Sequence, residues 1–434
     1  MEMKRTMRIG RDLWLWALYD FADSLGFVGL TFYFGLWFIA DLHGSDLWMS
    51  GAVALSTIAL FFTLPFLGHL SDVMRRRMPF LTTMAVLSIL SLLALGIVGS
   101  RVQSLTTRTT FIIIFLYFLF QFFYQAAFTF YNAFLRDLAD ENRSVEKVSG
   151  FGSGLGQVGN LIGLSLLFPV AQGTFPIFGV TGKPAVFIAA GLLFLLFSLP
   201  VFLFLREQGS NGPIRRHAGV MKTFGETLRD FRAIRRYPGV LAYIITYYLF
   251  ADAVLTLTLF VTLYMRVVGR FGSAHMMIIL LIGAFFTMIG AYTSPLFVTL
   301  FGGRKRAITV FICLWTVFMI AFALAASPVI FAIVVLLNGF AYGVLFSLSR
   351  SFYAILVPAE KQAEFFSVYV LFERAASILG PLVWSGAALL FISFGDDRYR
   401  FSMFALALIV AASPFPSGTC RSRRGLKTDT PSIA

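Results

Sequence analysis

Long apolar stretches alternate with short polar segments along the whole chain. Most of these stretches hold about 20 residues, the number that an α-helix needs to cross the hydrocarbon core of a bilayer. The pattern therefore predicts a series of membrane-spanning helices. The predicted spans cover residues 13–40, 48–69, 79–99, 109–135, 148–171, 184–205, 239–265, 276–299, 307–327, 328–352 and 366–394, and a twelfth begins at Phe401.

The composition agrees with a membrane protein. Of 434 residues, 58% are hydrophobic and 13% are charged, whereas soluble domains carry about 25% charged residues. The chain begins with a basic segment that leads into the first span, and this span is too long for the apolar core of a signal peptide. We therefore expect the first span to remain in the mature protein.

The formal net charge of +14 follows the predicted topology. With the N-terminus placed inside, 27 of the 35 Lys and Arg residues fall in cytoplasmic segments, as the positive-inside rule requires. Both termini are expected to be cytoplasmic, in the plasma (inner) membrane if the protein is bacterial. This distribution accounts for the basic charge without nucleic-acid binding.

The longest polar interruption divides the spans into two sets of six. The prediction is an N-terminal six-helix bundle at 1–205, a cytoplasmic linker at 206–238, a C-terminal six-helix bundle at 239–412 and a cytoplasmic tail at 413–434. In the linker, apolar residues recur every three or four positions with arginines between them, which favours an amphipathic helix on anionic lipid headgroups. The alternative is a solvated, charged linker.

Two short patterns occur once in each set of spans. The tripeptide "FAD" stands at residues 21–23 and again at 250–252. A basic loop follows the second span of each set, at 68–77 and at 296–306. The shared order and the near-constant offset indicate a duplicated six-helix unit.

The basic loops resemble a signature of the major facilitator superfamily, which combines a glycine, an acid and several basic residues after the second span. The glycine would allow close helix approach, the acid would cap a helix or pair across the bundle, and the arginines would bind carboxylates or lipid phosphates. The alternative is an ordinary basic turn on the cytoplasmic side. The expected cytoplasmic gating motif consists of Gly68, Asp72, Arg76, Arg77, Gly303, Arg304 and Lys305.

Three longer motifs narrow the resemblance. "WALYDFADS" (16–24), "YNAFLRDLADENRSVEKVSGFGSGLG" (131–156) and "AEFFSVYVLFERAASILGPL" (363–382) together resemble the vacuole effluxer family, which includes an autophagy-linked vacuolar amino-acid effluxer. The resemblance implies an all-α integral membrane protein with the major facilitator fold, in which 12 transmembrane helices form two six-helix bundles. It also implies secondary active transport, with amino acids as the favoured cargo. Asp20 matches the family acid, whereas Asp23 stands where asparagine is usual.

Charged side chains inside the predicted spans are candidate sites for solute and coupling-ion binding. A charge in the bilayer costs about 2.5–3.5 kcal/mol on insertion scales, so such residues usually face partners or a water-filled path. We expect a central cavity in which the acids exchange partners with an arginine and bind a coupling proton. The alternative is a static salt bridge that fastens the two halves. The candidates are Asp20, Asp23, Asp252, Glu373 and Arg374.

The fourth span carries polar side chains at helical spacing. Gln121, Gln125, Thr129 and Asn132 lie at i, i+4, i+8 and i+11. Such a stripe suits a cavity wall that hydrogen-bonds a small polar solute, and it suits interhelical hydrogen bonds equally well. Other members expected in the polar wall are Tyr19, Tyr124, Asn338 and Tyr342. The fifth span is rich in glycine instead, which favours close helix packing.

No motif in the sequence indicates catalysis, a metal, a cofactor or ATP. The two cysteines have no paired spacing. We therefore expect a monomeric transporter that moves a small polar solute along or against a gradient, by export or by uptake. The alternatives are a non-transporting membrane sensor or assembly partner with the same fold, and a lipid or drug exporter.

The end of the chain departs from the pattern. The last apolar stretch, 401–412, has twelve residues, and Pro414 and Pro416 follow it. A helix of this length spans about 18 Å, well short of the hydrocarbon core. The last helix is therefore expected to be short or atypical, unless the end of the reading frame is altered.

Overall fold

The computed structural model describes residues 2–74, 76–134, 138, 145–205, 235, 237–356, 372 and 375–412. Regular structure in this part of the chain is helical, apart from an isolated antiparallel bridge between Ile177 and Val180. Ten helices among the described residues are long and apolar enough to cross a membrane. The all-α prediction is confirmed, whereas these residues do not establish the predicted total of twelve spans.

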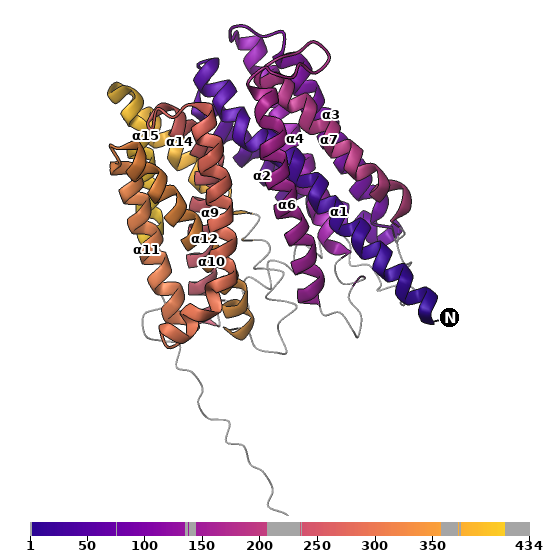
Figure 1. Ribbon diagram of the computed structural model, residues 1–434. Coiled ribbons are helices and arrows are strands. Elements are labelled where there is room, and N and C mark those ends of the chain that lie inside the picture. Colours follow the sequence, from indigo (N-terminus) through magenta and orange to yellow (C-terminus); the bar gives the residue numbers. More distant parts are fainter. Residues whose placement is uncertain are drawn as a thin grey trace, which may run out of the picture.

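The helices form two bundles that lie side by side, one from each half of the chain (Figure 1). The N-terminal bundle contains α1 (Glu2–Gly35), which continues as the π-helix η1 (Leu36–Asp41), then α2 (Asp46–Met74), α3 (Met78–Gly99), α4 (Thr107–Ala133), α6 (Val145–Ala171) and α7 (Lys183–Phe204). The C-terminal bundle contains α9 (Pro238–Val267), α10 (Ser273–Leu300), α11 (Arg304–Leu324), α12 (Pro328–Leu356), α14 (Leu379–Leu390), the 3₁₀-helix η3 (Ile392–Asp397) and α15 (Arg398–Ala411). The predicted tail, residues 206–234 of the predicted linker, Glu373 and Arg374 lie outside the described residues.

The eleventh and twelfth predicted spans differ from the structure. A continuous helix over 366–394 is wrong, because the chain leaves helical geometry at residues 376–378 and α14 ends at Leu390. Pro381 explains the interruption, since its ring lacks an N–H and clashes with the carbonyl group four residues earlier. The last helix begins at Arg398 rather than Phe401 and has 14 residues.

The two bundles share one apolar core. Phe34 and Phe38, near the end of the first span, belong to the same cluster of buried side chains as Phe260 and Leu263 of α9. A backbone contact adds to this packing, because a Cβ atom built on Gly35 would lie 3.9 Å from the carbonyl oxygen of Leu259. The first helix of each half therefore packs against its counterpart.

Glycines bring two helix pairs into backbone contact. A Cβ atom built on Gly159 of α6 would lie 2.6 Å from the carbonyl oxygen of Phe21 in α1. In the other bundle, a Cβ atom on Gly343 of α12 would lie 2.0 Å from the carbonyl oxygen of Thr287 in α10. These distances leave no room for a methyl group, so both helix pairs depend on glycine.

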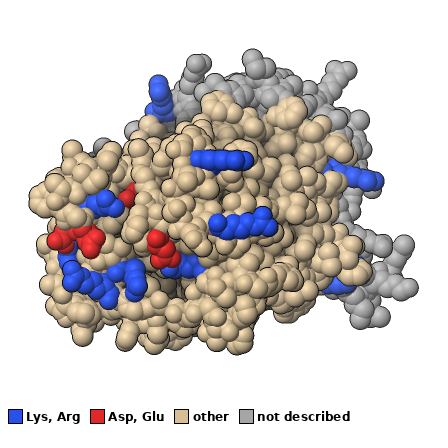
Figure 2. All heavy atoms as spheres, turned by 90° about the horizontal axis from the view of Figure 1, so that it is seen from above, with Lys and Arg blue, Asp and Glu red and all other residues tan. Residues whose placement is uncertain are grey.

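One end of the molecule is called the outer end below. It carries residues 41–46 and 392–400, and the distribution of Lys and Arg predicts that it faces away from the cytoplasm. Figure 2 shows this end, where acidic and basic side chains lie close together in one part of a largely uncharged face. Lys183 pairs with Asp41 here, within the N-terminal bundle.

Candidate functional site

Two carboxylates of α1 face two tyrosines of α4 inside the N-terminal bundle. The Asp20 side chain interacts with the hydroxyl group of Tyr131, and the Asp23 side chain interacts with that of Tyr124. Asp20 and Asp23 lie at i and i+3, and the tyrosines lie at i and i+7, so each pair shares one helix face. The acid–tyrosine cluster is defined as Asp20, Asp23, Tyr19, Tyr124 and Tyr131.

Aromatic stacking fixes the cluster. The rings of Trp16 and Tyr131 stack with their centroids 4.5 Å apart, and the indole N–H of Trp16 donates to the carbonyl oxygen of Tyr131 at 3.0 Å. The fully buried Tyr19 packs 5.2 Å from the Tyr131 ring, while Phe27 packs 5.8 Å from Tyr124. The two tyrosine hydroxyl groups are thus held in place opposite the acids.

The two acids differ in burial. Asp23 is only 2% exposed, whereas Asp20 is half-buried and lies where α1 meets α6. A Cβ atom built on Gly156 would lie 3.0 Å from the Asp20 carboxyl carbon. Exposed positions of α6, such as Gly154 and Gln157, flank this glycine. Asp20 is therefore the more accessible acid of the cluster.

The repeated acid in the second half has a different environment. Asp252 of α9 is fully buried, and neither of its carboxylate oxygens has a side-chain hydrogen-bond partner among the described residues. A Cβ atom built on Gly380 would lie 3.1 Å from its carboxyl carbon and 2.2 Å from the hydroxyl oxygen of Thr256. Because Gly380 belongs to the first turn of α14, the carboxylate lies at the positive end of that helix.

The predicted central cavity with its exchange of charged partners stays a prediction. Asp23 and Asp252 are enclosed in their own bundles rather than exposed to an open cavity. The predicted exchange with Arg374, and a part for Glu373, lie outside the described residues. Asp20 alone among the three described acids is partly accessible.

The polar stripe of α4 forms hydrogen bonds within its own helix. Gln121 donates to the hydroxyl group of Tyr117 at 3.1 Å, and Thr129 donates to the carbonyl oxygen of Gln125 at 3.0 Å. Asn132 is exposed. The described partners of the acids on α4 are its tyrosine hydroxyl groups.

The predicted counterpart in α12 is more enclosed. Asn338 is buried and donates to the carbonyl oxygen of Val334 at 3.0 Å. Its own amide oxygen has no hydrogen-bond partner among the described residues. Tyr342 is half-buried and packs 5.7 Å from the ring of Phe346. These two side chains do not join the acid–tyrosine cluster.

The first basic loop lies at the end of the N-terminal bundle opposite the outer end and is bonded to α4. Arg77 donates to the carbonyl oxygen of Ala133 at 2.8 Å, at the C-terminus of α4, where a cation is favourable. Arg76 is exposed. Gly68 has no described residue within 4 Å of a Cβ position, so the close helix approach expected there is not observed. Asp72 lies in α2, but its side chain is outside the described residues.

The second basic loop owes its shape to glycine. Gly303 has φ of 141° and its N–H donates to the carbonyl oxygen of Val298 at 2.8 Å. This positive φ is open to glycine and strained for other residues. Arg304 and Lys305 follow as the first residues of α11, with Arg304 exposed. The glycine thus closes the turn that presents the basic pair.

Replacing Arg77 by glutamine is expected to destabilise the protein, because it removes a charge-assisted hydrogen bond at a helix end. The loss should amount to about 1–3 kcal/mol. Arg76→Gln is the matched control, since an exposed side chain without a bond to the fold should change stability by less than about 0.5 kcal/mol. Thermal unfolding of the detergent-purified variants measures both. Equal melting temperatures for the two variants would contradict the assigned role of Arg77.

Comparison with known sequences decides the family. Residues 50–425 match the family described as "Vacuole effluxer Atg22 like". The chain belongs to this family.

Two sequence relatives bear on the kind of protein. The chain is 25% identical over 395 residues to an uncharacterized MFS-type transporter of Bacillus subtilis, covering 85% of this chain and 86% of that one. It is 24% identical over 193 residues to autophagy-related protein 22 of Saccharomyces cerevisiae, covering 42% of this chain and 36% of the yeast protein. The comparisons support a multi-pass membrane transporter of the MFS type.

Solved structures show the same fold for this family member. The nucleoside transporter NupG superposes with a TM-score of 0.72 at 13% identity, over 93% of this chain and 97% of that one. The D-xylose-proton symporter superposes with a TM-score of 0.67 at 13% identity, over 94% and 98%. The predicted major facilitator fold is confirmed at this level.

The remaining chemistry of the site is that of carboxylates and hydroxyl groups. No group of three or more His, Cys, Asp or Glu side chains is placed to hold a metal ion in the described part of the chain. Carboxylates beside tyrosine hydroxyl groups bind protons, ammonium groups and polar solutes. The spacing of polar residues along the fourth span did not predict that the tyrosines are the partners of the acids. Tyr131 lies within the second family motif, which is the one signal for it in the sequence.

Proposed function

We propose that the protein is a secondary active transporter that moves a small polar solute by alternating access, with proton coupling and with amino acids as the favoured cargo. The acid–tyrosine cluster is the observation that carries this proposal. A membrane protein retains buried carboxylates at a cost, and they commonly mark solute or proton pathways. The half-buried position of Asp20 supports a group that exchanges its proton or its partner.

The amino-acid class is favoured by the family and by the chemistry of the cluster. A carboxylate attracts the ammonium group of an amino acid, and tyrosine hydroxyl groups donate to its carboxylate. Asp23 stands where the resembled family usually has asparagine, so a second acid favours a cargo with added positive charge. Alternating access would follow from rocking of the two bundles around this site.

A solute screen followed by flux measurements tests the proposal. The purified protein is screened by thermal shift against the twenty amino acids, nucleosides and pentoses, and each stabilising solute is then tested as a radiolabelled substrate in proteoliposomes. We expect stabilisation and saturable flux for cationic or neutral amino acids, with a rate that depends on a pH gradient. Flux of a nucleoside or pentose instead would replace the proposed cargo. A folded protein with flux for none of them would favour the sensor alternative.

A further inference from the structure

A ladder of polar contacts joins the two halves along α2. Ser50 of α2 and Ser385 of α14 share a hydrogen bond of 2.5 Å between their hydroxyl groups. Deeper in the bundle, Thr57 and Ser377 share one of 3.1 Å. The α2 residues lie on one helix face, because Asp46, Ser50 and Thr57 follow the spacing i, i+4 and i+11.

The outermost step of the ladder carries charge. The hydroxyl group of Tyr399 donates to Asp46 at 3.1 Å, and Arg398 donates to Tyr399 at 2.8 Å. The guanidinium group of Arg398 also lies 3.7 Å from the Asp46 carboxylate. Asp46 and Tyr399 are buried. Four side-chain contacts between the two halves therefore lie along this ladder.

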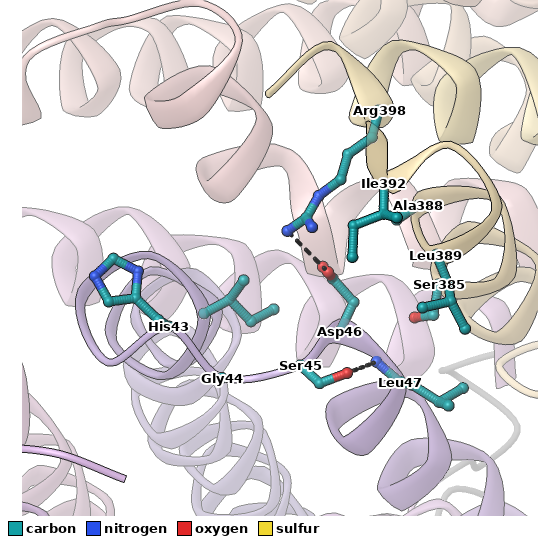
Figure 3. Close-up of a pocket in the computed structure, with 11 residues that line it drawn as sticks. His43, Gly44, Ser45, Asp46, Leu47, Ser385, Ala388, Leu389, Ile392 and Arg398 are labelled. Atoms are coloured by element: carbon teal, nitrogen blue, oxygen red, sulfur yellow. Dashed lines mark hydrogen bonds and ion pairs between the residues drawn. The ribbon is translucent and has the colours of Figure 1, made fainter. Parts of the chain in front are cut away.

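The charged step borders a cavity at the outer end. The cavity has a volume of about 410 Å³, and both halves line it. Figure 3 shows Asp46 and Arg398 pointing toward each other, with Ser385 of α14 to the right of Asp46. The remaining wall is mainly apolar, with Leu389 and Ile392 among its residues.

The position of the ladder has a mechanical consequence. In an alternating-access transporter, a path that opens to the outside must pass between the outer ends of the two bundles. Separating α2 from α14 and α15 breaks each step of the ladder, and the charged step costs most because a partly buried ion is left without its partner. The ladder therefore stabilises the state that is closed on the outer side.

We propose that the 410 Å³ cavity is the closed outer mouth of the solute path, and that Asp46, Arg398 and Tyr399 form the latch that keeps it closed. The inference rests on the proposed function, since a latch matters only if the two bundles separate at this end. Asp46 and Arg398 act as gating residues, and neither belongs to the acid–tyrosine cluster.

Cysteine accessibility tests the latch without a known solute. Val53 is buried on the ladder face of α2, between Ser50 and Thr57. A Val53→Cys reporter is placed in a background with Cys313→Ser and Cys420→Ser, and the protein is reconstituted into sealed liposomes. In the molecules whose outer end faces the added reagent, the rate of labelling by a membrane-impermeant maleimide then reports how often the outer mouth opens.

Breaking the latch should speed the labelling. We expect Asp46→Asn and Arg398→Gln each to raise the rate about tenfold, within the range of coupling between protein states. The labelling rate of the double variant should be close to that of either single variant, because both substitutions remove the same ion pair. Tyr399→Phe removes the hydrogen bonds to Asp46 and from Arg398 with little change in volume, but it keeps the ion pair, so it should raise the rate about two- to fivefold.

The ion pair of Asp41 and Lys183 supplies the matched control. It lies at the same end of the molecule but within one bundle, so Asp41→Asn and Lys183→Gln should leave the labelling rate unchanged. Unchanged rates in both latch variants and in Tyr399→Phe would overturn the proposal, as would equal acceleration by the control pair. Labelling is independent of flux, so faster labelling without transport would refute only the proposed function, and normal flux with unchanged labelling would refute only the latch.

Discussion

Asp20→Asn should lower the rate of proton-coupled flux at least about tenfold, which corresponds to the loss of about 1.4 kcal/mol or more of coupling. The substitution preserves the size of the side chain and its reach toward Tyr131, but it removes the charge and the site of protonation. Asp20 is the partly accessible acid of the acid–tyrosine cluster, so the proposed function places the exchange of a proton or an ammonium group there. The remaining flux should no longer respond to a pH gradient.

Asp23→Asn should have a much smaller effect on flux, of about threefold or less. Asp23 is enclosed beside Tyr124, and an asparagine amide can accept a hydrogen bond from the tyrosine in the same way. The resembled family usually has asparagine at this position, which supports tolerance. A change in the preferred charge of the cargo is the expected consequence of this substitution.

Proteoliposome flux measured between pH 5.5 and pH 8 separates these outcomes. Asp397→Asn serves as the control, because that carboxylate is 66% exposed and pairs with Arg400 within the C-terminal bundle. If Asp20→Asn left both the rate and its pH dependence as in the parent, the acid would be a static structural group. In that case, the melting temperature should fall instead, because the interaction of the Asp20 carboxylate with the Tyr131 hydroxyl group is weakened.

The apolar pattern predicts helix positions because burial in lipid requires continuous hydrophobic stretches. Predicted spans 79–99 and 307–327 lie within a few residues of α3 (Met78–Gly99) and α11 (Arg304–Leu324). The pattern fails at the eleventh span, where hydropathy remains high across Pro381. Backbone geometry, rather than hydrophobicity, ends the helix there.

Contacts between distant residues are much harder to predict. The intramembrane acids are visible in the sequence because each one interrupts an apolar stretch. Their tyrosine partners come from another helix, and nothing in the spacing of α4 distinguishes Tyr131 from its polar neighbours. The contacts of the latch are even harder to predict from the sequence, because Asp46 and Tyr399 lie 353 residues apart. Charges at the outer starts of α2 and α15 are the available signal, and they become a pair only in the folded protein.

The close packing at glycines of the C-terminal bundle was also not predicted from the sequence. The glycine-rich fifth span is conspicuous, and its Gly159 packs against α1 as close helix packing requires. Gly290, Gly339 and Gly343 are spread over two spans and form no dense motif. All three nevertheless approach the backbone of the neighbouring helix, and a Cβ atom on Gly290 would lie 2.2 Å from the carbonyl oxygen of Phe340.

Gly343→Ala should therefore destabilise the protein strongly, although it adds a single methyl group. That methyl group would lie 2.0 Å from the carbonyl oxygen of Thr287, so α10 and α12 must move apart along their shared contact. Inserting a methyl group into a tightly packed contact costs about 1–3 kcal/mol, and more where the obstacle is backbone. We expect a lower melting temperature and a smaller monodisperse fraction after purification, and a larger loss with Gly343→Leu.

Gly51→Ala supplies the matched control for this substitution. Gly51 also lies inside a membrane helix, but no described residue is within 4 Å of its Cβ position. Alanine has a higher helix propensity than glycine by about 1 kcal/mol, so this variant should be neutral or slightly stabilised. Thermal unfolding of both variants in the same detergent makes the comparison. If Gly343→Ala had the same melting temperature as Gly51→Ala, α10 and α12 would not be in backbone contact. The C-terminal bundle would then be packed more loosely than the structure indicates.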